Sequence, residues 1–415
     1  MKKLFLTGIL FELLLYFVLL DNNVAFITLN IGKIILIPCF FIYFQINYNL
    51  ILKPNIDGVR WYIIFVIFVF LSSILNIFKY SFDQIPLRSF FELLVYIYNI
   101  FLFFLIPRSL FNMDESFIKF FKLILSIILF FGFLDVITTY FGFDLLTRHL
   151  FDITNVGPRF HSFLGEPRDA FVVLSSLLFF ISYYNYKSFF TNYKYYVFAL
   201  LIAIILTQSL SGVLGIIIGL LLFIFYTIKI KILYKYIFPI SLVLLILFIG
   251  INVSTDGPVN RFTAYLDGLD ELFTLLKQGD ISPLFKGQVA SILPFYLQYQ
   301  NLINLNLFPL FFGYGIGMSS FYSSEFLDLN EVTNPSSQIV RIFFEFGFLG
   351  IYLFYKIIKE FYNKLELKNT PIYLQLSFFI FIGTNLSHRS NSLLIVFLMC
   401  VLTLNLFRKN IKNEI

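Results

Sequence analysis

Apolar segments recur along the whole chain, and their lengths constrain the fold more than any other feature. An α-helix needs about 20 apolar residues to cross a bilayer, and about twelve segments approach that length. They lie at 4–20, 24–44, 61–79, 86–106, 117–140, 170–186, 195–207, 210–227, 237–253, 338–355, 371–386 and 391–407. Only 13% of the residues are charged, against roughly 25% in a soluble domain. We therefore predict an all-α polytopic membrane protein with about twelve transmembrane helices, built as a single integral membrane domain over residues 1–415.

The first apolar segment and the cysteines argue against two other classes. MKKLFLTGILFELLLYFVLL is similar to a signal peptide, but DNN and a second apolar run follow it in place of a small-residue cleavage site. We therefore expect it to be the first spanning helix. Cys39 and Cys400 both lie in apolar segments, which argues against a disulfide framework or a thiolate metal site. Residues 195–227 can form two spans or one hairpin with a short first arm.

The distribution of lysine predicts the orientation of the chain. If the segments alternate from a cytoplasmic start, most lysines fall on the inside, for example Lys2, Lys3, Lys229 and Lys231. Because inner loops of membrane proteins collect positive charge, we expect both termini in the cytoplasm. The net charge of +6 then reflects topology, and no nucleic-acid partner is expected. Two long loops fall outside, 141–169 and 254–337, and the second has amphipathic segments suited to the membrane surface.

The outer segments are rich in arginine instead. Arginine presents a planar fork of donors that matches phosphate oxygens, whereas lysine acts as a point charge. On a face where positive charge brings no topological benefit, such a set predicts a phosphate-bearing ligand. Ion pairing within the same loops is the alternative for any single arginine. The set comprises Arg88, Arg148, Arg159, Arg168, Arg261, Arg341 and Arg389.

The most polar stretch of the first outer loop is GPRFHSFLGEPRDAF, residues 157–171. It gathers Arg159, His161, Glu166 and Arg168 between long apolar segments. Pro167 is suited to the first position of a helix, which would leave Glu166 just outside the first turn. A carboxylate at that position can take part in chemistry, or it can cap the free N–H groups of the helix. Both interpretations stay open.

A second polar group lies at the entrance of the tenth span, in NPSSQIVRIFFEFGFLG. Asn334, Ser337, Arg341 and Glu345 follow one another at steps of three and four, so they share one helix face. Ionisable residues in a span are costly unless they are paired or functional. Arg341 and Glu345 therefore belong to a functional site or form a buried structural ion pair. Two similar polar sets occur elsewhere. On the predicted fourth span they are Arg88, Glu92, Tyr96 and Asn99. In the predicted turn between the last two spans they are Asn385, Ser387, His388, Arg389 and Asn391.

The remaining motifs indicate packing rather than chemistry. Gly212, Gly215 and Gly219 follow TQSLSG with a spacing that lets another helix approach closely, and we prefer this packing interpretation. The chain has three histidines and contains no HExxH, Walker or dinucleotide-binding motif. We therefore expect no metal and no cofactor, and a reaction driven by an activated substrate.

Four features together carry a resemblance to the O-antigen polymerase family, called Wzy, which shares a superfamily with the O-antigen ligases. They are the many-span layout, RFHSFLGEPRDA before a span, the TQSLSG turn, and GYGIGM followed by NPSSQIVRIFFEFGFLG. Ligases carry a histidine in the large loop ahead of a G-x-x-G segment. The comparable position here is Asn334-Pro335-Ser336-Ser337, and no histidine occurs in 250–350. The resemblance implies a GT-C-like fold in the bacterial inner membrane, with the active site on the periplasmic side.

The reaction that this resemblance implies would explain the arginines. Such a polymerase moves a glycan chain from undecaprenyl pyrophosphate onto a carrier-linked repeat unit. Cationic groups stabilise the leaving pyrophosphate without a metal ion, and a general base activates the attacking hydroxyl. For the base we expect Glu166 first, His161 second and His388 third. For binding we expect Arg159 on the pyrophosphate, helped by Arg341, Arg168, Arg261 or Arg389, with Asn334 and Glu345 also facing the substrate.

The resemblance also implies partners and leaves alternatives open. The ligands would be an undecaprenyl-pyrophosphate-linked oligosaccharide and membrane lipid, and the partner proteins a chain-length regulator and a flippase. One alternative is a ligase that transfers the polymer to lipid A core. Another, from a different class, is a flippase for lipid-linked oligosaccharides. A small-solute transporter would need broken helices in two corresponding halves, and the sequence predicts none.

Overall fold

The fold is described by a computed structural model. It describes residues 4, 7–8, 31–46, 60–80, 93–100, 115–143, 159–162, 167–184, 194–227, 293–319 and 337–387. In this part of the chain every regular element is a helix and no strand occurs, which is consistent with a helical membrane protein.

The helices follow the predicted apolar segments closely. They are α2 (Ile31–Ile46), α4 (Arg60–Tyr80), α6 (Glu115–Tyr140), α8 (Pro167–Tyr184), α10 (Lys194–Leu206), α11 (Leu210–Thr227), α14 (Leu293–Ile303), α15 (Leu307–Phe312), α17 (Gln338–Lys364), η6 (Leu367–Asn369) and α18 (Ile372–Ser387). Residues 93–100 are also helical. The predicted spans at 237–253 and 391–407, and nearly all of 4–20, lie outside the described residues. Twelve spans therefore stay a prediction.

Within the described ranges, no single helix combines the length and the apolar character of a membrane span. One bent pair, Lys194–Leu206 with Ser211–Tyr226, has both when its arms are taken together, and the arms meet at 119°. Gln208 between them has a φ of 46°, and the N–H of Gly212 donates to Ser209 Oγ at 3.2 Å. Residues 195–227 therefore form a bent helix pair whose first arm is the shorter one, and whether they make one span or two stays a prediction.

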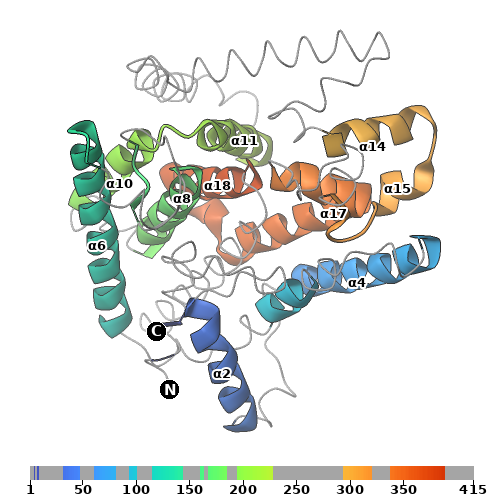
Figure 1. The fold of residues 1–415 in the computed structure, drawn as a ribbon, viewed down its shortest axis with the longest axis horizontal. Helices are drawn as coiled ribbons and strands as arrows, with labels where there is room; N and C mark the ends of the chain where they lie inside the picture. The colour runs from blue at the N-terminus through green and yellow to red at the C-terminus, as the bar shows by residue number, and fades with distance from the viewer. Residues whose placement is uncertain are drawn as a thin grey trace.

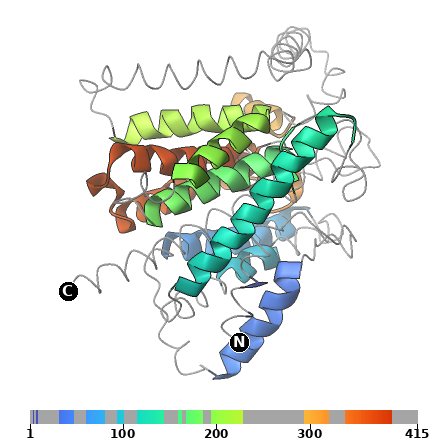
Figure 2. The ribbon, with the colours of Figure 1, turned by 90° about the vertical axis from the view of Figure 1, so that its left-hand side faces the viewer.

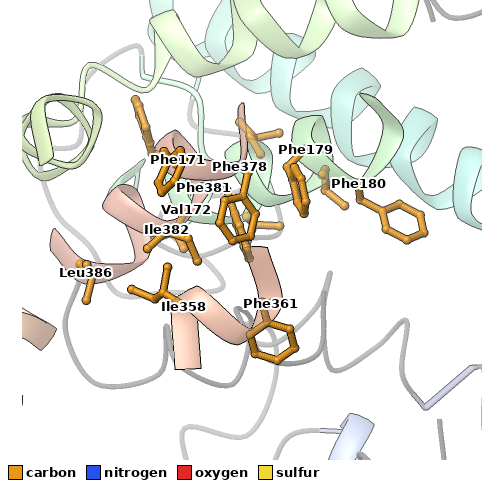
Figure 3. Close-up of a cluster of buried hydrophobic side chains, with 14 of the residues drawn as sticks. Phe171, Val172, Phe179, Phe180, Ile358, Phe361, Phe378, Phe381, Ile382 and Leu386 are labelled. Carbon is orange, nitrogen blue, oxygen red and sulfur yellow. The ribbon is translucent and has the colours of Figure 1, made fainter. Parts of the chain in front are cut away.

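The centre of the molecule is formed by α8, α11 and α18 (Figure 1). Phenylalanines from α8 and α18 interleave there, and the rings of Phe179 and Phe381 stack at 5.1 Å (Figure 3). A Cβ on Gly383 of α18 would lie 2.2 Å from the carbonyl oxygen of Gly215 and 2.4 Å from the nitrogen of Gly219. The backbones of α11 and α18 therefore touch, and the packing interpretation of Gly215 and Gly219 is confirmed.

Two further helices flank this centre. The hydroxyls of Ser126 in α6 and Tyr196 in α10 lie 3.0 Å apart, and α6 runs obliquely across the same side of the molecule (Figure 2). α4 packs along α17. The N–H of Trp61 in α4 donates to Glu360 Oε2 in α17 at 3.0 Å. The rings of Phe65 and Phe346 lie 5.4 Å apart further along the same contact.

α17 differs from its prediction in two ways. It continues to Lys364, past the predicted span of 338–355, and it is broken at Gly347, where φ is 62° and ψ is −159°. Sequence analysis predicted no broken helix here, so the break is a correction. Only glycine adopts such a left-handed, extended conformation at low cost. The break divides α17 into a part before Gly347 and a longer part after it, which we call the outer half and the inner half after the predicted topology.

Candidate functional site

A buried ion pair lies on the outer half of α17. Arg341 Nε donates to Glu345 Oε1 at 3.1 Å, and Ser319 Oγ donates to the same oxygen at 2.6 Å. Arg341 is 5% exposed, while Glu345 and Ser319 are fully buried. Arg341 and Glu345 are one helical turn apart, as their spacing predicts, whereas Ser319 arrives from a different part of the chain.

The break at Gly347 explains how Ser319 reaches this pair. When a helix stops, the carbonyls of its last turn lose their usual partners. Here the N–H of Tyr314 donates to Phe344 O at 3.0 Å, and the N–H of Gly315 donates to Glu345 O at 2.9 Å. The loop after α15 is therefore hydrogen-bonded to the end of the outer half, and this contact carries Ser319 to Glu345.

Gln298 of α14 completes the same arrangement. Its Nε2 donates to Pro309 O at 3.0 Å, to Phe343 O at 3.1 Å and to Phe344 O at 3.3 Å. One fully buried amide thus joins α14, α15 and the broken end of α17. Gln298 and Ser319 were not identified from the sequence: Gln298 lies in a helix without a recognised motif, and Ser319 directly follows GYGIGM, of which only the layout was used.

Two buried acceptor oxygens beside the ion pair have no hydrogen-bond partner among the described residues. Glu345 Oε2 and Gln338 Oε1 are buried and accept no hydrogen bond from the described residues. Both belong to the outer half of α17, on either side of Arg341 along the chain. Buried polar atoms are nearly always hydrogen-bonded. Within the described residues, the carboxylate therefore has one oxygen held by Arg341 and Ser319 and a second, buried oxygen that accepts no hydrogen bond.

The polar stripe predicted before residue 100 is present in part. Tyr96 and Asn99 are buried, and the hydroxyl of Tyr62 in α4 donates to the carbonyl oxygen of Tyr96 at 3.2 Å. The Tyr96 ring also packs against Phe346 at 6.4 Å. Helix 93–100 therefore lies beside the ion pair, while Arg88 and Glu92 are outside the described residues.

A second buried pair joins the polar stretch of the first outer loop to α6. His161 Nε2 lies 2.9 Å from Asp135 Oδ2, and both residues are 1% exposed. His161 Nδ1 donates to the carbonyl of Ser162 at 3.0 Å, because a carbonyl oxygen can only accept. Both ring nitrogens therefore face oxygen atoms of the protein.

The backbone around His161 is anchored at two more points. Ser162 Oγ donates to Ile128 O at 2.8 Å, and the N–H of Phe160 donates to Leu206 O at 2.9 Å. Gly132 leaves room for the Phe160 ring, which a Cβ would approach to 2.3 Å. Residues 159–162 are thus held between α6 and the end of α10, and the partly buried Arg159 is held with them.

Asp135 was missed from the sequence, although a signal was present. It is a single carboxylate in the apolar run FFGFLDVITTY, and an ionisable residue inside such a run marks a candidate functional position. Asp135 lies five residues before the end of α6, away from the loops and helix entrances in which the other polar groups were found.

Several helix ends meet on one side of the central group. Ser175 of α8 and Thr384 of α18 lie 2.8 Å apart through their hydroxyls. Ser387 Oγ donates to Ser211 O at 2.7 Å, and Ser337 Oγ donates to Leu386 O at 3.0 Å. The N-terminal turns of α11 and α17 therefore lie beside the last turn of α18, and α8 contacts the same turn through Ser175, two turns into its own length. Helix N-termini favour anions, and Arg341 lies in the first turn of α17.

The predicted site residues fall into three groups. Arg341 and Glu345 are in direct contact, and Arg159 and His161 belong to one anchored segment. Arg168 lies in the first turn of α8. The others, Glu166, Arg261, Asn334, His388 and Arg389, lie outside the described residues. No group of three His, Cys, Asp or Glu that could hold a metal ion occurs among the residues that the structure describes.

Comparison with known proteins identifies a family for part of the chain. Residues 195–355 match the family model Wzy_C, described as O-antigen ligase. This range contains α10, α11, α14, α15 and the Arg341–Glu345 pair. The match supports the superfamily of O-antigen ligases and polymerases, whose members are enzymes of the glycosyl-transfer type in surface polysaccharide synthesis. It does not separate polymerases from ligases. No curated protein and no solved structure gives a significant match.

Proposed function

We propose that this protein is a polymerase of a bacterial surface polysaccharide such as O-antigen. The observation that carries the proposal is that the family match includes the segment holding Arg341, Glu345 and Ser319. The chain has no histidine in 250–350, where ligases of the superfamily carry one, and this departure favours a polymerase. The enzyme would act in the inner membrane with both termini in the cytoplasm and its site on the periplasmic side.

The reaction is a glycosyl transfer between two carrier-linked glycans. The bond between the anomeric carbon of the growing chain and its pyrophosphate breaks, and the same carbon forms a bond to a hydroxyl of the incoming repeat unit. Undecaprenyl pyrophosphate leaves with the electron pair, and the hydroxyl proton passes to a base. Negative charge grows on the leaving group, so fixed cationic donors lower the barrier.

Arg341 and Arg159 are the arginines that we assign to the pyrophosphate, with Arg168, Arg261 and Arg389 as further contributors. Arg341 is oriented by Glu345, and Arg159 is held by the anchored segment 159–162. Preorganised donors of this kind stabilise charge without reorganising during the reaction. We expect activity on carrier-linked repeats to survive EDTA; loss on chelation that magnesium restores would contradict the arginine assignment.

The general base is assigned to Glu166, ahead of His161 and His388. Both ring nitrogens of His161 contact oxygen atoms of the protein, and the side chain is buried. In this position the ring is suited to holding Arg159 in place, and less suited to receiving a substrate proton. Glu166→Gln should cut chain extension by roughly 10²-fold or more, the scale of a lost general base, at unchanged protein level.

The first experiment is deletion of the gene followed by gel analysis of the surface polysaccharide. A polymerase deletion leaves one repeat unit attached to the lipid core. A ligase deletion, the alternative favoured by the description of the matching family model, leaves carrier-linked polymer and none on the core. Loss of both polymer and single units, with repeat units retained inside, would indicate a flippase and contradict the proposal.

The second experiment compares variants in the deletion strain. Arg159→Lys keeps the charge and loses the bidentate fork, so most polymer should disappear, and Arg159→Ala should be worse. Arg168→Ala should be milder if that residue only begins α8. Normal polymer in Glu166→Gln, together with none in His161→Ala or His388→Ala, would transfer the base to a histidine.

A further inference from the structure

α14, α15 and the loop that follows form a hairpin, residues 293–319, that packs into the break of α17. Sequence analysis expects this region outside, at the membrane surface. We propose instead that α15 is embedded in the bilayer and that its exposed side contacts lipid acyl chains. The inference rests on the proposed membrane location and adds a lipid-facing element within the predicted large outer loop.

The contact with α17 gives one measure of the depth of this hairpin. A Cβ on Gly313 would lie 2.2 Å from the carbonyl of Glu345, so the end of α15 is level with Glu345. Glu345 is eight residues beyond Ser337, at the outer end of α17. At 1.5 Å per residue, the end of α15 lies about 12 Å inward along the helix axis.

The contact with α4 gives a second measure from the opposite side. Ser72 Oγ donates to Phe312 O at 3.2 Å, and the rings of Phe68 and Phe312 lie 6.5 Å apart. Ser72 is twelve residues beyond Arg60, the inner end of α4, which corresponds to about 18 Å. In the predicted topology, Ser337 and Arg60 lie at opposite surfaces of the bilayer, and the two distances together reach about 30 Å, the thickness of the hydrocarbon layer. With that topology, the end of α15 lies within this layer.

The polar backbone of the hairpin is satisfied in a way that suits such a position. Irregular backbone at membrane depth is tolerated only when protein groups satisfy it. Gln298 serves three carbonyls, and the N–H groups of Tyr314 and Gly315 bond to α17. The N–H of Gly313 donates to Pro309 O at 2.9 Å, and that of Asn306 donates to Asn301 O at 2.8 Å. The loop of glycines 313, 315 and 317 is buried.

The outward side of α15 is apolar and continues onto its neighbour. Phe308 is 37% exposed and Phe311 is 45% exposed. The Phe311 ring lies 6.0 Å from that of Phe348, which is 45% exposed in the inner half of α17. On the neighbouring helix α4, Phe70 is 48% exposed. Exposed aromatic rings at this depth, bordered by exposed rings of predicted spanning helices, fit hydrocarbon chains better than water.

Tryptophan fluorescence can test this position in the full-length protein. Trp61 is the single tryptophan of the chain, so a Trp61→Phe background is dark. Phe308→Trp places a probe on α15, Phe70→Trp provides a deep reference on α4, and Phe143→Trp provides a reference at the outer end of α6, where Phe143 is 74% exposed. Each protein is reconstituted in vesicles of phosphatidylcholine brominated near the middle of the acyl chain.

We expect brominated lipid to quench the Phe308→Trp variant as strongly as Phe70→Trp, and iodide in the buffer to quench only Phe143→Trp. Quenching of Phe308→Trp by iodide, with Phe70→Trp still quenched by lipid, would overturn the embedded position of α15. Protection from both quenchers would also overturn it, because a protein surface or a second copy would then cover the side. If iodide quenches all three, the membrane location itself fails.

Discussion

Two close helix contacts in this molecule are built on glycine, yet they depend on different physics. In the first, α11 and α18 remain regular helices, and Gly215, Gly219 and Gly383 let their backbones touch. In the second, α17 is broken at Gly347, and the loop at Gly313 meets the broken end. The first contact needs only missing side chains. The second needs Gln298, Ser319 and an ion pair to satisfy the groups that the break sets free.

This difference predicts how each contact fails. A shape-based contact fails when any atom is added, because backbone cannot move aside cheaply. A contact based on hydrogen bonds fails when one partner is removed, because the other partner stays buried and unsatisfied. It can survive when both partners are replaced together. Only the second contact contains groups that could serve chemistry.

The largest loss of stability is expected from Gly383→Ala. The added Cβ would stand 2.2 Å from Gly215 O and 2.4 Å from Gly219 N, so α11 and α18 must separate. Overpacking costs about 1–3 kcal/mol and occasionally more, and a clash with the backbone of two residues, which cannot move aside, should exceed even the cost of breaking a buried ion pair. The measurement is the folded fraction in detergent by size-exclusion chromatography. Gly142→Asn is the control, because Gly142 has open space and a φ of 87° that asparagine tolerates. Equal behaviour of the two variants would contradict the prediction.

The next largest effect is expected from breaking the ion pair on one side. Glu345→Leu leaves Arg341 without its buried carboxylate, at a cost of about 3–5 kcal/mol. Adding Arg341→Met should restore most of that stability, since apolar replacement of a buried pair is often neutral. The double variant should nevertheless make no polymer if Arg341 binds pyrophosphate. Thermal unfolding and gel analysis are measured on the same variants, and a stable double variant that polymerises would make the pair purely structural.

Gln298→Ala should have an intermediate effect. It removes the donor shared by Pro309 O, Phe343 O and Phe344 O, and an unsatisfied buried group costs about 1–3 kcal/mol. Gln298→Met keeps the volume without the donors and should lose a similar amount. Gln45→Ala, at an exposed position of α2, should stay within about 0.5 kcal/mol of the parent. Full stability of Gln298→Met in thermal unfolding would show that the break does not need this amide.

The smallest change in stability is expected from Glu360→Gln, at the glutamate of α17 that contacts α4. Burial raises the pKa of the Glu360 carboxyl, and the N–H of Trp61 together with the charges of Lys364 and Arg60 offsets this only in part. Because the folded pKa lies above the unfolded one, stability falls as the pH rises from below 4.5 through the raised value. Glu360→Gln should remove this pH dependence and gain less than about 1 kcal/mol at pH 7, given solvent screening. An unchanged slope of unfolding temperature against pH would contradict this.

The first contact could be predicted from the sequence and the second could not. Gly215 and Gly219 are four residues apart, so their spacing alone places them on one face of one helix. Gly347 and Gly350 have a similar spacing, yet Gly347 ends a helix. The reason lies in donors supplied by Gln298, Tyr314 and Gly315, which are distant along the chain. A local pattern cannot report whether such donors will arrive.

The same limit applies to the candidate site. Arg341 and Glu345 were predicted as a pair because they are one helical turn apart. Asp135 and His161 form an equally close pair, but one belongs to an apolar helix and the other to a loop. Their contact depends on how α6 and residues 159–162 pack together, which no spacing within either segment encodes.

The break in α17 also sets the order in which the protein can be assembled. The ribosome makes residues 293–319 before residues 343–345, whose carbonyls later accept from Gln298, Tyr314 and Gly315. A chain is synthesised at about 5–20 residues per second, so these donors wait for seconds without their acceptors on α17. The hairpin therefore enters its place after α17 has been delivered to the membrane, as a late event in biogenesis. A nascent chain that stops before residue 343 holds every residue of the hairpin and none of its acceptors on α17.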